Sequence, residues 1–269
     1  MRVLIVTAVP AERDAVVRGI GATAPEVAEL PVPGGTIHRL SPVPPTGPPL
    51  TVDVLAAGVG PAAAAAGAAA ALTAAAVART PYDLAVSAGI GGGFTTERPD
   101  ATERPATGRS APARLGSIVV ADAIVAADLG AETPDGFAAV TDLGFGTVEH
   151  LPPAPLVAAV AEATDAVRGT VLTVSTVTGS AERAAELLRR HPQAAAEAME
   201  GFGVAEAAAA QSVPALEVRA ISNTVGPRDR AAWRIGEALE ALTGAFGTIT
   251  PLLGTWTWTW TLDPEGTRQ

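Results

Sequence analysis

Residues 198–223 read AMEGFGVAEAAAAQSVPALEVRAISN, and the pattern of polar and apolar side chains in this stretch decides the expected fold. Glu200 precedes an Ala-rich segment that predicts a helix, and Asn223 follows the strand-like apolar run Ala215–Ile221. If both polar side chains stand at strand ends, they meet at the carboxyl edge of a sheet, where open α/β folds bind ligands. Glu12, just after the first predicted strand, is the third candidate for such a cleft.

The composition indicates one acidic globular domain. With 269 residues, of which 48% are hydrophobic and 17% charged, the chain can bury a large core and is too apolar for disorder. We therefore expect a single domain over residues 1–269, with an exposed insertion at 95–114 and a C-terminal tail at 254–269. The net charge of −10 disfavours nucleic acid as a partner. The absence of cysteine and lysine excludes disulfides and thiolate nucleophiles and argues against Schiff-base and P-loop chemistry.

Two apolar stretches are poor candidates for targeting or membrane segments. The N-terminal run Met1–Val6 is too short for a signal peptide and is soon followed by charged residues. Residues 56–78 are long enough to span a bilayer, but they are mostly alanine and contain Gly58, Gly60 and Pro61. This composition favours a buried helix of a globular domain, so we expect a cytoplasmic protein without a membrane partner.

Strand-like and helix-like segments alternate along the chain, which predicts a layered α/β fold. The expected strands are Arg2–Ala8, Thr36–Leu40, Thr51–Ala57, Asp83–Ser87, Gly116–Ala127, Gly169–Ser175 and Ala215–Ile221. The expected helices begin at Pro10 and cover 61–79, Pro153–Val167, Ser180–Arg190 (with Ser180 as N-cap), Phe202–Gln211 and Asp229–Phe246. One conflict remains: Ala194–Met199 has helix-forming composition, yet Glu200 can stand at a strand end only if this segment is a strand.

Neither a dinucleotide site nor a metal site is favoured by the motifs. Gly58-x-Gly60-x-x-Ala63 follows a strand and opens a helix, as in a Rossmann fold, and a dehydrogenase stays open as an alternative. However, the next strand begins with Asp83 and ends in Ser87-Ala88-Gly89, so it lacks an acidic residue at its end to bind a ribose. The three histidines have no metal-ligand spacing; they are His38, His150 and His191. We expect no cofactor and no metal.

Six short motifs, in a fixed order over most of the chain, carry a family resemblance. They are Val6–Arg13, Gly58–Ala63, Ser87–Phe94, Leu115–Asp122, Ala198–Gly201 and Arg219–Asn223. With them the chain resembles the purine nucleoside phosphorylase/nucleosidase superfamily, in its methylthioadenosine/S-adenosylhomocysteine nucleosidase branch, and within that branch the futalosine hydrolases. The resemblance implies a nucleoside-phosphorylase-like three-layer α/β fold, with a central mixed, partly barrel-like sheet flanked by helices. It also implies a homo-oligomer, dimer or tetramer, to which the tail with Trp256, Trp258 and Trp260 on one extended face can contribute.

The resemblance further implies cleavage of the N-ribosidic bond of a purine nucleoside, through a state similar to a ribosyl cation. Glu12 matches the family's catalytic glutamate and would take a proton from the attacking water. Glu200 would bind the ribose hydroxyls and stabilise the positive charge, and Met199 would pack against the sugar. A carboxylate at position 12 would repel phosphate, which favours hydrolysis over phosphorolysis. The same motifs supply three more expected substrate-binding residues, Ile90, Gly91 and Ser222.

Asn223 departs from the adenine-specific members, which carry Asp at the matching position. Its amide can donate two N–H groups, to N7 and to a 6-oxo group, which favours hypoxanthine or guanine over adenine. Asn cannot deliver a full proton, so hydrogen bonding to N7, or a proton from another group, must help the leaving base.

Futalosine carries hypoxanthine and a carboxylated aromatic tail beyond C5′, and Arg228, Arg230 and Trp233 are expected to contact that tail. The expected reaction is therefore hydrolysis of futalosine to hypoxanthine and dehypoxanthine futalosine, a step of menaquinone synthesis. A methylthioadenosine-type nucleosidase and a noncatalytic nucleoside-binding protein of the same fold stay open as alternatives.

Overall fold

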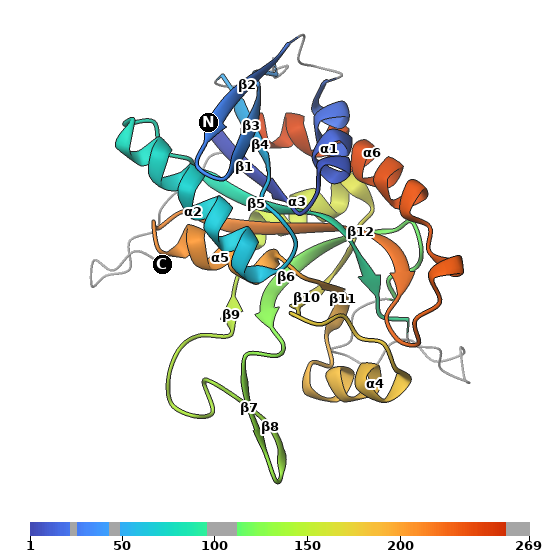
Figure 1. The fold of residues 1–269 in the computed structure, drawn as a ribbon. Coiled ribbons are helices and arrows are strands. Elements are labelled where there is room, and N and C mark those ends of the chain that lie inside the picture. The colour runs from blue at the N-terminus through green and yellow to red at the C-terminus, as the bar shows by residue number, and fades with distance from the viewer. Residues whose placement is uncertain (22–25, 43–48, 96–111, 257–269) are drawn as a thin grey trace.

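The computed structural model describes residues 1–21, 26–42, 49–95 and 112–256 (Figure 1). The strands in these ranges are β1 (Arg2–Thr7), β2 (Val27–Val32), β3 (Gly35–Leu40), β4 (Thr51–Ala56), β5 (Leu84–Gly93), β6 (Ile118–Ala126), β7 (Gly130–Thr133), β8 (Gly136–Ala139), β9 (Glu149–His150), β10 (Val167–Thr173), β11 (Ala194–Ala198) and β12 (Ala215–Thr224). The helices are α1 (Pro10–Gly21), α2 (Pro61–Val77), α3 (Ala154–Thr164), α4 (Ala181–Arg190), α5 (Gly201–Ala209) and α6 (Ile235–Thr255), with a short 3₁₀ turn at Arg230–Ala232.

A mixed sheet with strand order β11-β10-β6-β12-β5-β1-β4-β3-β2 forms the centre of the protein, and β9 pairs with β6. The sheet closes on itself because the far end of β5 also pairs with β11 in antiparallel orientation. Glycines permit this contact: a Cβ on Gly91 would lie 2.9 Å from the Glu197 carbonyl oxygen. Strands β5, β12, β6, β10 and β11 thus form a small barrel, and the expected mixed, partly barrel-like sheet is confirmed.

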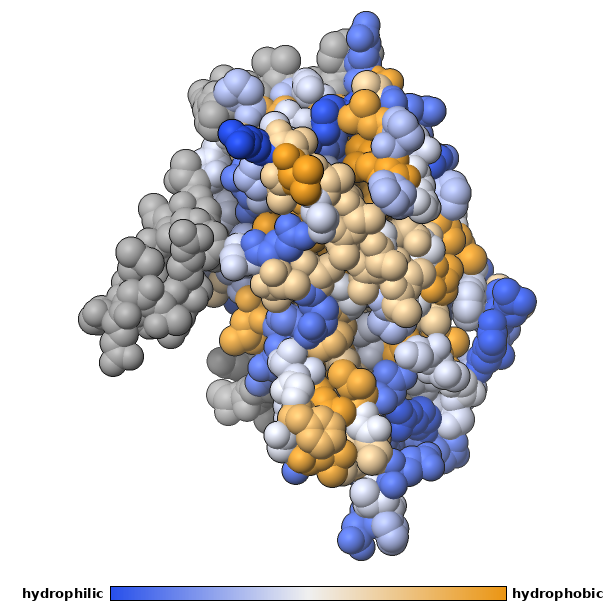
Figure 2. Space-filling model, turned by 60° about the vertical axis from the view of Figure 1, so that its left-hand side comes forward, coloured by the Kyte–Doolittle hydropathy of each residue, from blue (hydrophilic) through white to orange (hydrophobic). Residues whose placement is uncertain are grey.

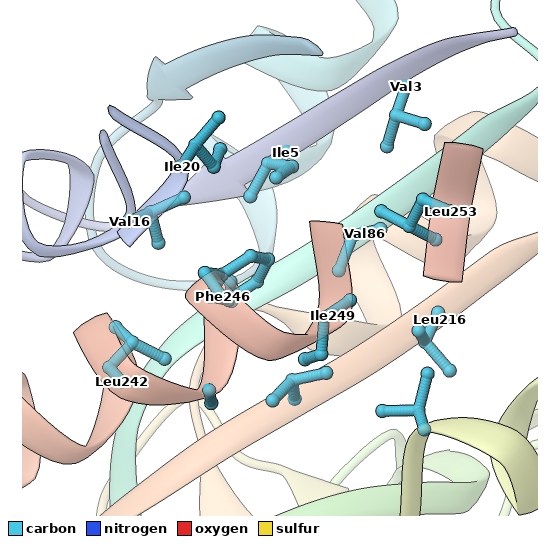
Figure 3. Close-up of a cluster of buried hydrophobic side chains, with 14 of the residues drawn as sticks. Val3, Ile5, Val16, Ile20, Val86, Leu216, Leu242, Phe246, Ile249 and Leu253 are labelled. Atoms are coloured by element: carbon cyan, nitrogen blue, oxygen red, sulfur yellow. The ribbon is translucent and has the colours of Figure 1, made fainter. Parts of the chain in front are cut away.

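Helices cover both faces of the open part of the sheet. Figure 3 shows that α1 and α6 pack side by side on one face, where Ile20 of α1 and Phe246 and Ile249 of α6 gather around Ile5 and Val86 of the sheet. On the opposite face, alanines of α2 and α5 pack against the sheet, where β1 contributes Leu4 and Val6. Because successive side chains of β1 point to opposite faces and both faces are buried, its sequence is one continuous apolar run. The three-layer arrangement expected from the sequence is therefore present.

Several expected elements have different bounds in the structure. The segment 194–199, with its helix-forming composition, is strand β11, because pairing with β10 and β5 outweighs the helical propensity of alanine. Strand β5 runs to Gly93 rather than Ser87. The helix expected at 229–246 is instead a 3₁₀ turn followed by α6, which ends at Thr255, so the tail expected from residue 254 begins in a helix.

Other expectations lie partly or wholly outside the described residues. Of the insertion expected at 95–114, only Thr95 and residues 112–114 are described, and of the tail beyond α6 only Trp256, which packs against the core. The hairpins β2–β3 and β7–β8 are elements that we did not fully expect; β7–β8 projects from the body of the protein (Figure 1). Across the described ranges we find no helix that combines the length and the apolarity needed to cross a bilayer.

Candidate active site

A cleft of about 550 Å³ opens at the carboxyl ends of β1, β5, β11 and β12. All of the expected catalytic and substrate-binding residues line it, from five separate parts of the chain: Glu12, Ile90, Gly91, Met199, Glu200, Ser222, Asn223, Arg228, Arg230 and Trp233. The structure therefore brings together side chains that are as many as 221 positions apart in the sequence, the difference between 233 and 12. Their chemical roles stay predictions.

Glu12 is held in the first turn of α1 by backbone amides. Its Oε2 accepts hydrogen bonds from the N–H groups of Ala8 (3.0 Å) and Val9 (3.3 Å), and its Oε1 accepts one from Ile90 (2.9 Å). The side chain is only 4% exposed, and this burial raises the pKa of the carboxyl group, although Arg219 and the amides act in the opposite direction. A carboxylate that is fixed in place and more basic than usual is suited to accept a proton from water.

Glu200 stands at the junction of β11 and α5 and is held from two sides. Its Oε1 accepts a hydrogen bond from the N–H of Gly60 (3.1 Å), and its Oε2 accepts one from Arg219 Nη1 (3.2 Å). Gly60 has a φ of 93°, a conformation that favours glycine. The glycine turn between β4 and α2, which suggested a dinucleotide site, therefore positions a carboxylate in this protein.

Sequence reasoning did not single out the buried ion-pair cluster beneath these carboxylates. Arg219 is fully buried and donates from Nε to Glu217 (2.8 Å), from Nη1 to Glu200, and from Nη2 to the Ser87 hydroxyl (2.8 Å). Glu217 is also fully buried, and burial raises the pKa of its carboxyl group. A signal was present in the sequence, because two opposite charges two residues apart in an apolar strand point to the same face.

Gly89 places Glu12 and the ion-pair cluster side by side. A Cβ at this position would lie 2.6 Å from Glu12 Oε1 and 2.8 Å from Arg219 Nη1. The carboxylate of Glu12 and the guanidinium of Arg219 therefore both fill the space that a side chain at position 89 would occupy. A cation beside two carboxylates at the floor of the cleft lowers the electrostatic cost of keeping both of them ionised.

Asn223 has its amide orientation fixed by two neighbours. Its Oδ1 accepts a hydrogen bond from the Ser222 hydroxyl (2.9 Å), and its Nδ2 donates to the carbonyl of Thr224 (3.1 Å). One of the two N–H groups that we expected to face a base is thus donated to the protein itself. In this orientation the amide offers a ligand one N–H, whereas binding N7 and a 6-oxo group together would take both.

Arg228, Arg230 and Trp233 form a cationic and aromatic rim on the connection between β12 and α6. Each guanidinium carbon lies 5.8 Å from the centroid of the Trp233 ring, within the range of a cation–π interaction. Both arginines are exposed and the tryptophan is half-buried. The rim can therefore offer positive charge and a flat apolar surface to a ligand that extends out of the cleft. Within the described ranges, no group of three or more His, Asp or Glu side chains is arranged to hold a metal ion.

Comparison with known proteins agrees with this geometry. Residues 2–248 match the phosphorylase superfamily. The chain belongs to this superfamily. Within it, the chain is 64% identical over 256 residues to the futalosine hydrolase of Streptomyces coelicolor, an alignment that covers 95% of this chain and 98% of that protein. It is 42% identical over 254 residues to the futalosine hydrolase of Acidothermus cellulolyticus, covering 91% and 89% of the two chains. These identities place the chain in the futalosine hydrolase family of the superfamily.

Solved structures of nucleosidases share the fold. An S-adenosylhomocysteine nucleosidase from Streptococcus pyogenes, in complex with 5-methylthiotubericidin, has a TM-score of 0.72 at 18% identity, over 94% of this chain and 97% of that one. A 5′-methylthioadenosine/S-adenosylhomocysteine nucleosidase from Colwellia psychrerythraea, in complex with adenine, has a TM-score of 0.68 at 22% identity, over 93% of both chains. At this identity the likeness shows the fold alone and leaves the substrate to be argued from the site.

Proposed function

We propose that this protein hydrolyses the N-ribosidic bond of futalosine and releases hypoxanthine and dehypoxanthine futalosine. The observation that carries the proposal is the convergence of Glu12, Glu200 and Asn223 on one cleft. The relatives from Streptomyces coelicolor and Acidothermus cellulolyticus, which carry the name futalosine hydrolase, support the choice of substrate.

Glu200 stabilises the positive charge that develops on the reacting sugar. Cleavage of the bond between C1′ and N9 gives the ribose the character of a cation, as in glycoside hydrolysis. The carboxylate of Glu200 accepts hydrogen bonds from the ribose hydroxyls, with Gly60 and Arg219 holding it in position. Because this geometry is fixed before the substrate binds, stabilising the developing charge requires no reorganisation of the protein.

Glu12 activates the water that attacks C1′. Its oxygens accept hydrogen bonds from three backbone N–H groups, and its buried position raises its pKa, so the carboxylate is a stronger base than one in water. Phosphate is a poor alternative nucleophile here, because Glu12 and Glu200 would repel its charge. Arg219, the buried cation beside them, is already engaged by Glu200 and Glu217.

Asn223 and the arginine rim recognise the two ends of the substrate. The amide of Asn223 donates one N–H to the imidazole edge of the hypoxanthine, while its oxygen accepts a hydrogen bond from the Ser222 hydroxyl. The amide oxygen keeps a second lone pair, so this arrangement does not by itself exclude adenine, and the choice of hypoxanthine is supported by the relatives named futalosine hydrolase. Arg228 and Arg230 bind the carboxylate of the tail, and Trp233 packs against its aromatic ring.

The experiment that tests the proposal is incubation with futalosine, inosine and methylthioadenosine, with the released base identified by chromatography. We expect hypoxanthine from futalosine as the fastest reaction, slower release from inosine, and little adenine from methylthioadenosine. Faster release of adenine would instead identify a methylthioadenosine-type nucleosidase. No released base, together with measurable binding of the nucleoside, would identify a noncatalytic binding protein.

We propose in addition that the protein acts in the cytoplasm, in menaquinone synthesis, as a homo-oligomer. Figure 2 shows a broad apolar area, mostly pale orange, on the side of the protein that carries α2 and α5. Large apolar side chains are exposed elsewhere on the surface too, including Val59 (57%) and Phe145 (62%). Contiguous apolar surface of this kind is typical of subunit contacts. Light scattering on the purified protein tests the assembly, with a mass near 26.8 kDa as the result that contradicts it.

A further inference from the structure

Glu197 is a buried carboxyl group in the wall of the cleft that has no role in the reaction as described above. It lies on β11, lines the cleft and is only 5% exposed. Its Oε1 accepts a hydrogen bond from the N–H of Thr178 (2.8 Å), and its Oε2 accepts one from the hydroxyl of the same residue. Thr178 belongs to the connection between β10 and α4 and also lines the cleft. Both side chains thus line the space for a ligand, and the threonine hydroxyl is hydrogen-bonded to the carboxyl group.

The strand register puts Glu197 and Asn223 on opposite sides of Gly92. Gly92 of β5 pairs with Glu197 on one side and with Asn223 on the other, so the two residues are separated by two strand spacings, about 10 Å between Cα atoms. Residues paired in this way point to the same face of the sheet, and a Cβ on Gly92 would lie 3.1 Å from Asn223 Nδ2. Glu197 and Asn223 thus reach into the cleft from either side of a residue without a side chain.

The surroundings of Glu197 favour its neutral, protonated form. Its partner on β10, Leu172, belongs to an apolar cluster that α4 covers. This burial raises the pKa of Glu197, and the charge of Asp128, just after β6, acts in the same direction. Arg183 of α4 and the hydrogen bonds from Thr178 act against it. A carboxyl group with a raised pKa holds its proton to a higher pH than an ordinary carboxyl group, which suits it to act as an acid.

Asn223 cannot protonate the departing purine, and an acid such as Glu197 can. The departing purine must gain a proton or strong hydrogen bonds, and an amide cannot give up a full proton. Asn223 also offers only one N–H, so a second acceptor atom on the edge of a 6-oxopurine has no donor from this residue. Thr178 is a polar side chain on the other side of Gly92, and its hydroxyl can both donate and accept.

We propose that Thr178 and Glu197 together act as the general acid of the purine-binding site. The Thr178 hydroxyl hydrogen-bonds the purine, and Glu197 supplies, through this hydroxyl, the proton that the departing purine takes up. This inference rests on the proposed function. As the bond between C1′ and N9 breaks, its electron pair stays on the purine. With Glu197 protonated, the Thr178 hydroxyl accepts a hydrogen bond from the carboxyl group in place of donating one to it, so it can give its own proton to the purine and take the carboxyl proton of Glu197.

The protons of the whole step balance. The water oxygen bonds to C1′ and loses one proton to Glu12, while hypoxanthine leaves as a neutral molecule with the proton that came from Glu197. After turnover Glu12 is protonated and Glu197 is ionised, and exchange with solvent restores both. Thr178 would be the catalytic residue that touches the base, and Glu197 the proton source behind it.

The test compares two substrates that differ in their need for a proton. Futalosine needs one for its purine, whereas 4-nitrophenyl β-D-ribofuranoside releases a phenolate that needs none. We expect Glu197→Gln to lower kcat for futalosine about 10²- to 10⁴-fold, the usual contribution of acid–base catalysis, and to change kcat for the nitrophenyl riboside less than about threefold. Thr178→Val should give the same pattern, and Thr178→Ser should restore activity because it returns the hydroxyl.

The pH profile and a control variant complete the test. Wild-type kcat for futalosine should fall as the pH rises through the raised pKa of Glu197, and this fall should be absent in Glu197→Gln. Glu206→Gln, which removes a carboxylate of α5 outside the cleft, should behave as wild type. If Glu197→Gln lowers kcat equally for both substrates, or for neither, this inference alone is overturned. A wild-type protein that leaves futalosine intact overturns the proposed function and this inference with it.

Discussion

Arg219 Nη1 lies 3.2 Å from Glu200 Oε2, and the two side chains are 0% and 6% exposed. The pair connects the barrel interior to the residue that we expect to bind the ribose. Because Arg219 also holds Glu217, one cation serves two buried carboxylates. A charge removed from water needs such partners, since an isolated buried ion costs several kcal/mol. The stability of the cluster and the position of Glu200 therefore depend on the same side chain.

Replacement of this arginine should destabilise the fold. Arg219→Met leaves Glu200 and Glu217 buried without a cation, and we expect the free energy of unfolding to fall by about 3–5 kcal/mol in urea titrations. The double variant Arg219→Met/Glu217→Leu should lose less, because it also removes one of the two carboxylates. Arg18→Met, which breaks an ion pair with Glu240 at the surface, is the control and should change stability by at most about 1 kcal/mol. Equal losses in the single and double variants would contradict the coupling.

Glu12 should determine the acidic limb of the activity profile. The reaction needs its ionised form, and burial raises its pKa above the ordinary value of 4.5, so kcat/KM should fall as the pH is lowered through a value above 4.5. Glu12→Gln should lower kcat about 10²- to 10⁴-fold while hypoxanthine still binds, as calorimetry can measure. Asp14→Asn, an exposed carboxylate of the same helix, should leave both quantities unchanged. Wild-type kinetics in Glu12→Gln would remove this residue from the mechanism.

Asn223 should determine which base is released. In Asn223→Asp the new carboxyl group, when protonated, can donate its proton to N7, and its other oxygen can accept a hydrogen bond from the amino group of adenine. We expect the ratio of kcat/KM for futalosine to that for methylthioadenosine to fall at least about tenfold. The measurement is base release from each substrate by the purified variant. An unchanged ratio would mean that Asn223 does not contact the edge of the base.

Arg228 should act on the tail of the substrate and not on the sugar or base. Removing its charge in Arg228→Ala should raise KM for futalosine, which carries a carboxylate, and leave KM for inosine nearly unchanged. Arg234→Ala is a matched control, because this nearby arginine pairs with Glu237 outside the cleft. Equal effects of Arg228→Ala on the two substrates would refute recognition of the tail.

The sequence was most informative where local pattern and tertiary role agree. The buried strand β1 and the N-capped helix α4, in which the Ser180 hydroxyl accepts from the N–H of Arg183, could be predicted from their residues. Strand β11 was ambiguous, because its alanines favour a helix and only pairing on both sides makes it a strand. The extension of α6 past Pro251 depends on burial of Ile249 and Leu253, which no local rule contains.

The candidate site was predictable for a different reason. The motifs around Glu12, Glu200 and Asn223 identified the cleft through family resemblance, whereas spacing along the chain could not show that they meet. The hydrogen bonds of the buried charged groups around the site were not anticipated. Arg219 donates to Glu217 and Ser87, and Glu197 accepts from Thr178. The pair of Glu217 and Arg219 lies within β12, whereas the other two contacts join β12 to β5 and a loop to β11. Contacts between separate elements become visible only when the strand order and register are known.

The most direct test of the central claim is a crystal structure of the protein with hypoxanthine and dehypoxanthine futalosine bound. We predict that the base accepts a hydrogen bond from Asn223 Nδ2, that the ribose hydroxyls contact the Glu200 carboxylate, and that Glu12 faces C1′. Products that occupy another surface, or a ribose that Glu200 does not touch, would contradict the account.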